Sequence, residues 1–302
     1  MEHLPTNKAP DMMSKMYGLE LFPDGSVIFC FQENGGGIVK VDARSNVVWE
    51  LLGDFHHSVS VADDGFFWTF TGAQDAFDHQ FAKVSVETGE IETVIDMAEV
   101  RRRNPSLHIF NLQYDTSSPD ISHGNDIEPL SREMAEAFPQ FEAGDLLLSY
   151  RTQNLVFVLD PDTLEVKWWR VGAWDRQHDP DWEPDGTIAV FSNNSVTDRA
   201  FSDVVAIDPA SYSHRTIVDG EKHGCRSSLT SGHQRTTFDT RVVTSTNQGW
   251  AFEVDSQEQI VFSFVNTYEN ESQSGLDISE AMRLDEDFFT QEFKASCGIE
   301  SS

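Results

Sequence analysis

The sequence predicts an all-β chain folded as a single β-propeller, and three observations support this prediction. One kind of hairpin recurs, with an apolar strand, a turn of Asp, Ser, Thr or Gly, and a second strand that often contains Trp or Phe. The equivalent positions 42, 85, 160, 208 and 255 are 43, 75, 48 and 47 residues apart. Pairs of strands around an Asp-Gly turn precede several of these hairpins. Repeats of about 40–50 residues with four strands each are typical of a propeller.

Five repeats can be followed along the chain, at about 17–53, 54–97, 107–172, 173–220 and 222–267. The Asp-Gly turns at Gly25, Gly65 and Gly186 lie between alternating apolar residues, which favours a tight hairpin because Gly adopts the positive φ of such turns. The spacing of 75 predicts an insertion at about 98–143. It contains Arg101–Arg103, interpreted as a solvated helix end, and a helix candidate near 132–138. Four tryptophans are expected to pack between blades: Trp49, Trp168, Trp169 and Trp250.

The domain prediction is a propeller over residues 1–268 followed by an acidic tail over 269–302. Asp277-Ile278-Ser279-Glu280 is interpreted as the start of a short helix in the tail. Its apolar stripe would consist of Ile278, Met282, Phe289 and Phe293, packed on the propeller. The blade number stays open from the repeats alone. The ring could have five blades, could be completed to six by the first sixteen residues and the tail, or could lack an N-terminal blade.

Charge and cysteine content limit the possible partners. With 21 Lys and Arg against 51 Asp and Glu, the net charge is −30. Such a field repels nucleic acid and anionic membranes, so neither is an expected partner. An anionic substrate would need a locally positive or neutral funnel, and added salt should then lower its KM or leave it unchanged. The three cysteines form no CxxC pair, and no metal site or cofactor is expected. The N-terminus has no signal-peptide pattern, and no apolar run is long enough for a transmembrane segment.

Histidines recur at one position of the repeat. His57 lies eight residues before Gly65, and His178 lies eight residues before Gly186. Because equivalent positions of successive blades converge on the axis of a propeller, both imidazoles are expected to face one funnel. His123 begins the blade between them. Taken one at a time, these histidines could equally be structural, hydrogen-bonded to neighbouring backbone.

The sequence resembles the arylsulfotransferases that use aryl sulfate esters as donors. The resemblance extends from about residue 17 to 268, and three motifs carry it: His123-Gly124-Asn125, Ser149-Tyr150-Arg151 and Gln177-His178. The segment Ser231–Arg235 is similar to the last blade of the family, so His233 and Arg235 are secondary candidates. The resemblance also implies six blades. The family is normally exported, which leaves the compartment of this chain open.

The resemblance implies a ping-pong transfer of a sulfuryl group to a phenolic acceptor through a sulfo-histidine. His178 matches the nucleophile, with His123 and Arg151 as further catalytic residues. His57, Asn125 and Arg151 match residues that bind the sulfate. The choice between His56 and His57 stays open, although the spacing favours His57. Asp179 is expected to help fix the tautomer of His178.

Two alternative functions remain at this stage. The first is a catalytically silent propeller that serves as a binding platform. The second is a metal-dependent propeller hydrolase such as a lactonase, which would need carboxylate and Asn oxygens converging on calcium. The predicted funnel contains mainly His and Arg, which favours the sulfotransferase. The sequence predicts neither the oligomeric state nor the physiological donor.

Overall fold

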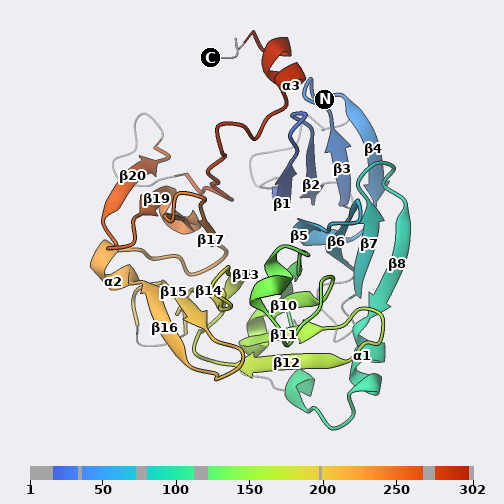
Figure 1. The fold of residues 1–302 in the computed structure, drawn as a ribbon, viewed down its shortest axis with the longest axis vertical. Helices are drawn as coiled ribbons and strands as arrows, with labels where there is room; N and C mark the ends of the chain where they lie inside the picture. Colours follow the sequence, from blue (N-terminus) through green and yellow to red (C-terminus); the bar gives the residue numbers. More distant parts are fainter. Residues whose placement is uncertain are drawn as a thin grey trace, which may run out of the picture.

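A computed structural model of the chain describes residues 16–32, 36–72, 80–111, 122–196, 199–267 and 276–298. Within these ranges the strands form five four-stranded antiparallel sheets. In each sheet the strands are ordered as in the chain, and Figure 1 shows the sheets arranged as blades around a common centre. The all-β propeller prediction is therefore confirmed.

The strands of the five blades have the following bounds. Blade 1 contains β1 (Met16–Leu21), β2 (Val27–Phe31), β3 (Gly37–Val41) and β4 (Val47–Leu52). Blade 2 contains β5 (Phe55–Val61), β6 (Phe66–Thr71), β7 (Gln80–Ser85) and β8 (Ile91–Asp96). Blade 3 contains β9 (Gly124–Pro129), β10 (Leu146–Tyr150), β11 (Leu155–Leu159) and β12 (Val166–Val171). Blade 4 contains β13 (His178–Trp182), β14 (Ile188–Ser192), β15 (Asp203–Ile207) and β16 (His214–Val218). Blade 5 contains β17 (Gly232–Arg235), β18 (Arg241–Ser245), β19 (Trp250–Val254) and β20 (Ile260–Val265).

Helical segments are short and lie between strands. They are α1 (Met97–Arg103), η2 (Ile109–Asn111), η3 (Met134–Ala137), η4 (Arg151–Gln153), α2 (Gly220–His223), η5 (Thr246–Gln248) and α3 (Gln291–Ser296). Asp96 caps α1 by accepting from the backbone N–H of Ala98, and Arg102 and Arg103 pair with Glu99 one turn back. The Arg triplet is thus the end of a surface helix, as expected. The helix predicted at 132–138 is a single 3₁₀ turn.

The core lies between neighbouring blades because the middle strands are apolar on both faces. β11 and β14 are buried throughout. Trp49 of blade 1 stacks on Phe67 of blade 2, with ring centroids 6.2 Å apart. Trp168 is buried in a cluster with Trp182, and Trp250 packs on the cluster between blades 4 and 5. Trp169 is 38% exposed, so the packing prediction is wrong for this residue.

The described residues form five blades, so the six-blade expectation is not confirmed, and residues 1–15, which could have contributed to a sixth, lie outside the described ranges. The tail forms no strand within residues 276–298 and therefore builds no sixth sheet. It runs between blade 5 and blade 1 instead (Figure 1). Arg283 donates to both carboxylate oxygens of Glu253 in blade 5, at 2.6 and 2.7 Å. Thr290 donates its backbone N–H to the carbonyl of Pro23 in blade 1. The tail thus joins the first blade to the last.

The predicted helix start at Asp277 is also wrong. Residues 276–282 are not helical, because their backbone groups bond to the propeller: the N–H of Ala281 donates to Oγ1 of Thr244. The helix begins later, as α3, with Thr290 as its N-cap. Of the expected apolar stripe, Phe289 and Phe293 contact each other, with centroids 4.7 Å apart. Among the described residues, no helix is long and apolar enough to cross a membrane.

Candidate functional site

The innermost strands of four blades are interrupted near their starts. The pairing register shifts between Tyr17 and Glu20 in β1 and between His56 and Ser60 in β5. It also shifts between Gly124 and Asp126 in β9 and between His178 and Asp181 in β13. Bulges of this kind turn side chains away from the regular alternation of a strand. Here they occur where the predicted site residues lie.

His57 lies at the bulge of β5 with a φ of 67°, in the left-handed region. Its ring meets the ring of His123 edge-on, with centroids 4.9 Å apart, and it stacks on Tyr17 at 5.7 Å. His56 lies behind, stacked on Phe70, with its Nδ1 2.6 Å from Nδ1 of His57. At that distance one nitrogen donates and the other accepts, so at least one of the two rings is neutral. His57 is therefore the residue of the pair that lies against the other predicted site residues.

His123 and Arg151 come from segments that are joined through their backbones. His123 immediately precedes β9, and Arg151 begins η4 directly after β10. The N–H of Arg151 donates to the carbonyl of His123 at 3.0 Å. A second backbone hydrogen bond joins the neighbouring residues of the same two segments: the N–H of Thr152 donates to the carbonyl of Ser122 at 3.2 Å. These bonds fix the two residues relative to each other.

His178, the first residue of β13, is held by Asn193. Its Nδ1 lies 2.7 Å from Oδ1 of Asn193. Asn193 in turn donates through Nδ2 to the carbonyls of Ser227 and Thr230, each at 2.8 Å. Because these carbonyls use both amide hydrogens, the oxygen of Asn193 can only accept, and Nδ1 of His178 must carry the proton. The lone pair of His178 is then on Nε2.

Asn125 links blade 3 to the segment before His178. It donates through Nδ2 to the carbonyl of Gln177 at 2.8 Å and is buried. Gln177 donates to Oγ of Ser149 and to the carbonyl of Leu155, on either side of Arg151 in the sequence. Among the described residues, Oδ1 of Asn125 and Oε1 of Gln177 have no hydrogen-bond partner. Asn125 thus positions the segment before His178.

The site is electrostatically suited to an anion. Burial lowers the pKa of His57 well below its usual value, and the nearby His56, His123, His178 and Arg151 lower it further. Burial also lowers the pKa of His178 to about 3; its bond to Asn193 opposes this shift, while Arg151 and His123 add to it. Both imidazoles are therefore neutral at pH 7, and Arg151 supplies the positive charge. Of the predicted residues, the structure brings together His57, His123, Arg151 and His178, with Asn125 bound to the residue before His178.

A second cluster of ionisable groups lies further along the inner strands. Asp179, Asp181 and His233 offer ligand atoms that all lie within 4.8 Å of one another. Nδ1 of His233, however, is 3.0 Å from Asp181 and also 3.0 Å from Nη1 of Arg241. The cationic Arg241 thus occupies the position from which an ion would meet this nitrogen, and the set fits a metal poorly. His233 therefore belongs to a hydrogen-bonded network with Asp181 and Arg241, and Arg235 pairs with Glu183 and Asp239.

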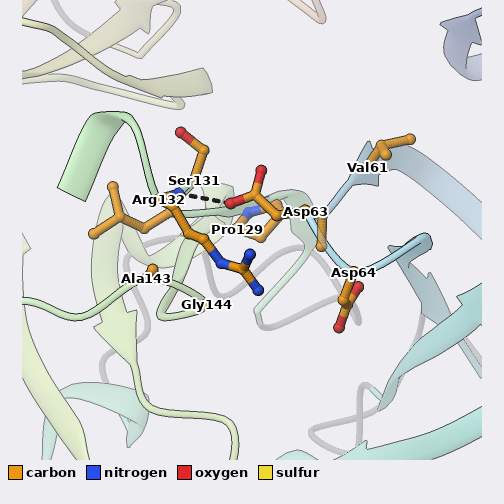
Figure 2. Close-up of a pocket in the computed structure, with 10 residues that line it drawn as sticks. Val61, Asp63, Asp64, Pro129, Ser131, Arg132, Ala143 and Gly144 are labelled. Carbon is orange, nitrogen blue, oxygen red and sulfur yellow. Dashed lines mark hydrogen bonds between the residues drawn. The ribbon is translucent and has the colours of Figure 1, made fainter.

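A small surface cleft of about 130 Å³ lies elsewhere, at the ends of β5 and β9 (Figure 2). Asp63 and Asp64 face it from blade 2, and Arg132 from blade 3. His57 and His123 lie near the opposite ends of the same strands. The cleft is therefore separate from the histidine site.

Sequence reasoning missed Asn193 and assigned its role to Asp179. The carboxylate of Asp179 instead accepts from the backbone N–H of His233 in blade 5. Asn193 follows β14 directly, a position with no sequence signal of its own, because its importance depends on carbonyls from the segment before β17. Tyr17, which stacks on His57, was missed for the same reason.

Comparison with known proteins supports the propeller fold. Three solved structures have a similar fold at low identity, and all show the fold alone. The first is a protein of unknown function from Bacteroides caccae, with TM-score 0.59, 9% identity, and coverage of 84% of this chain and 82% of the other. The second is a luciferin-regenerating enzyme, with TM-score 0.54, 10% identity, and coverage of 82% and 75%. The third is virginiamycin B lyase from Staphylococcus aureus, with TM-score 0.52, 10% identity, and coverage of 86% and 73%.

No curated protein matches the chain significantly. The family model described as arylsulfotransferase (ASST) matches residues 18–267, which include all five blades except Met16 and Tyr17 at the start of β1. This range contains every histidine of the candidate site. The chain thus belongs to the arylsulfotransferase family.

Proposed function

We propose that this protein transfers a sulfuryl group from an aryl sulfate ester to a phenolic acceptor through a sulfo-histidine on His178. The observation that carries the proposal is the bond between Nδ1 of His178 and Asn193, which leaves the lone pair on Nε2. A neutral imidazole with a fixed tautomer is a competent nucleophile. Arg151 and the histidines beside it provide the charge and donors that a sulfate group needs.

In the first half-reaction, Nε2 of His178 attacks sulfur while the S–O bond to the aryl oxygen breaks. The aryl oxygen leaves as a phenolate with the bonding electron pair. The sulfo-imidazole ring then carries a positive charge, which Oδ1 of Asn193 stabilises through the Nδ1 proton. Arg151 holds the three sulfate oxygens, as cations do in phosphoryl transfer.

In the second half-reaction, the acceptor phenol gives its proton to His57 or His123, and its oxygen attacks sulfur. The S–N bond breaks and its electron pair returns to Nε2. The histidine then releases the proton to solvent, where the phenolate that left first takes up a proton, so that atoms and charges balance. A depressed histidine pKa suits this role, because the ring starts neutral and gains affinity for a proton once an anion is bound.

The test is covalent trapping. Brief incubation with 4-nitrophenyl sulfate without acceptor, followed by alkaline quench and mass spectrometry, should find one sulfuryl group on the peptide with His178. His178→Ala should abolish both the adduct and turnover. Arg151→Ala should keep residual activity, since the loss of one oxyanion partner costs about 10²–10³-fold in rate. An adduct on His57 or His123, or ping-pong turnover in His178→Ala, would contradict the assignment.

A further inference from the structure

The outer strand of blade 5 differs from the other four outer strands. Every residue of β20 is exposed, and its sequence Ile-Val-Phe-Ser-Phe-Val contains no charge. Charged residues occur on the other outer strands: β4 contains Glu50, β8 contains Glu92, β12 contains Lys167 and β16 contains Arg215. Charged side chains on an edge strand prevent pairing with another strand. β20 lacks this protection and lies at the rim of the ring (Figure 1).

We propose that β20 pairs with β20 of a second copy of this chain, in an antiparallel arrangement about a two-fold axis at Ser263. Residues 261–265 read Val-Phe-Ser-Phe-Val, which is the same in both directions. An antiparallel pair centred on Ser263 therefore places Phe262 opposite Phe264 of the other copy, and Val261 opposite Val265. A two-fold interface requires such self-complementarity.

The backbone of β20 is oriented for this pairing. The N–H of Asn266 points inward and donates to the carbonyl of Gly249 at 2.7 Å. The direction of the backbone N–H and C=O groups alternates along an antiparallel strand. The N–H and C=O of Phe264 and Phe262 therefore also point inward, toward β19. The N–H and C=O of Ser263 and Val265 then point outward, whereas a register shift between Phe262 and Ile260 interrupts the alternation at Val261. The outward groups are those that would bond across the two-fold axis, with Ser263 facing Ser263.

Charge and area both favour a second copy as the occupant. At a net charge of −30 two copies repel each other, so they can meet only where charge is absent, and residues 259–267 carry none. Val261, Phe262, Phe264 and Val265 are 50–56% exposed. Half of a large side chain is about 100 Å², so the pair would bury roughly 700 Å² in total, before the backbone is counted. This lies in the range of weak, concentration-dependent dimers.

The first test measures the oligomeric state of the full chain by sedimentation velocity over a concentration series. We expect a monomer–dimer equilibrium that added salt strengthens, since salt screens the repulsion. Phe264→Lys should weaken dimerisation at least tenfold. Val48→Lys, on β4 and equally exposed, is the matched control and should leave it unchanged. A monomer at all concentrations in high salt, or equal effects of the two variants, would overturn the proposal.

The second test examines the register. In a Cys297→Ser background, which removes the exposed cysteine, Ser263→Cys should form an intermolecular disulfide on mild oxidation. The paired Cα atoms would lie about 5.5 Å apart, within the range of a disulfide. Val261→Cys should not form one, since the two copies of residue 261 would lie on the order of 13 Å apart. Equal cross-linking of both variants would contradict a two-fold axis at Ser263.

Discussion

At the scale of single residues, the proposed reactivity of His178 would depend on the side-chain amide of Asn193, which bonds its Nδ1. Two backbone carbonyls of the segment before β17 accept hydrogen bonds from Nδ2 of Asn193 and so fix its orientation. Oδ1 of Asn193 in turn bonds Nδ1 of His178 in blade 4. Thr230 and Ser231 both have positive φ, 56° and 97°, in the segment that presents one of these carbonyls. The geometry of blade 5 thus determines which nitrogen of His178 is free.

Asn193→Ala should therefore lower the rate of sulfo-enzyme formation by roughly 10²-fold while leaving KM for the donor nearly unchanged, because a wrong tautomer removes the nucleophilic lone pair. Single-turnover kinetics of 4-nitrophenol release would measure this rate. Asn194→Ala is the control, since Asn194 is equally buried but donates to the carbonyl of Phe201. Equal losses in both variants would mean that Asn193 acts only through stability.

At the scale of elements, the tail replaces strand pairing with side-chain contacts. Glu253 on β19 is 3% exposed as a side chain and accepts from Arg283 of the tail and from Oγ1 of Thr240. Arg283 also stacks over the ring of Phe238, 4.4 Å from its centroid. Burying the charge of Glu253 is costly unless a cation compensates it, so the stability of this contact depends on Arg283.

Arg283→Ala should lower the free energy of unfolding by about 1–3 kcal/mol, because it leaves Glu253 buried without a cation. Arg283 itself is 42% exposed, which keeps the expected loss in the lower part of the range for broken buried pairs. Denaturant titration would measure the loss. In the double variant with Glu253→Gln the loss should shrink, since the uncompensated charge is gone. A double variant that is less stable than Arg283→Ala would refute this explanation.

At the scale of the whole molecule, the sequence predicted the repeated four-stranded blades but not the contacts that join one blade to another. The hairpin period located the five blades of the described residues, and the turn spacing predicted that His57 and His178 lie on inner strands, here β5 and β13. The path of the tail and the contacts of Asn193 could not be predicted, because they join segments far apart in the sequence. The blade number was taken from the family resemblance and is not confirmed.

The carboxylates of the inner strands make the stability of the ring depend on pH. Burial and the neighbouring Glu183 raise the pKa of Asp181 to about 8, while Arg241 opposes this shift. Burial first, and then neighbouring acids, also raise the pKa of Asp179 to about 7 and of Glu280 in the tail to about 8. The same causes raise the pKa values of Asp126 and Glu128. These groups hold protons in the folded chain that the unfolded chain has lost by about pH 5.

The contribution of these carboxylates is therefore complete below the unfolded pKa and is lost as the pH rises toward 8. The buried histidines act in the opposite sense: His57, His178 and His233 have lowered pKa values, so their contribution is gained as the pH rises through the unfolded value of about 6.5 and is complete about one unit above it. Between pH 6.5 and 8 the loss from the five buried carboxylates outweighs the remaining gain from the histidines, and the melting temperature should fall. Asp181→Asn should make this fall shallower, whereas Glu50→Gln, on the exposed face of β4, should leave it unchanged. A melting temperature that rises from pH 6.5 to 8, or the same slope in Asp181→Asn, would show that Asp181 is ionised in the folded chain at neutral pH.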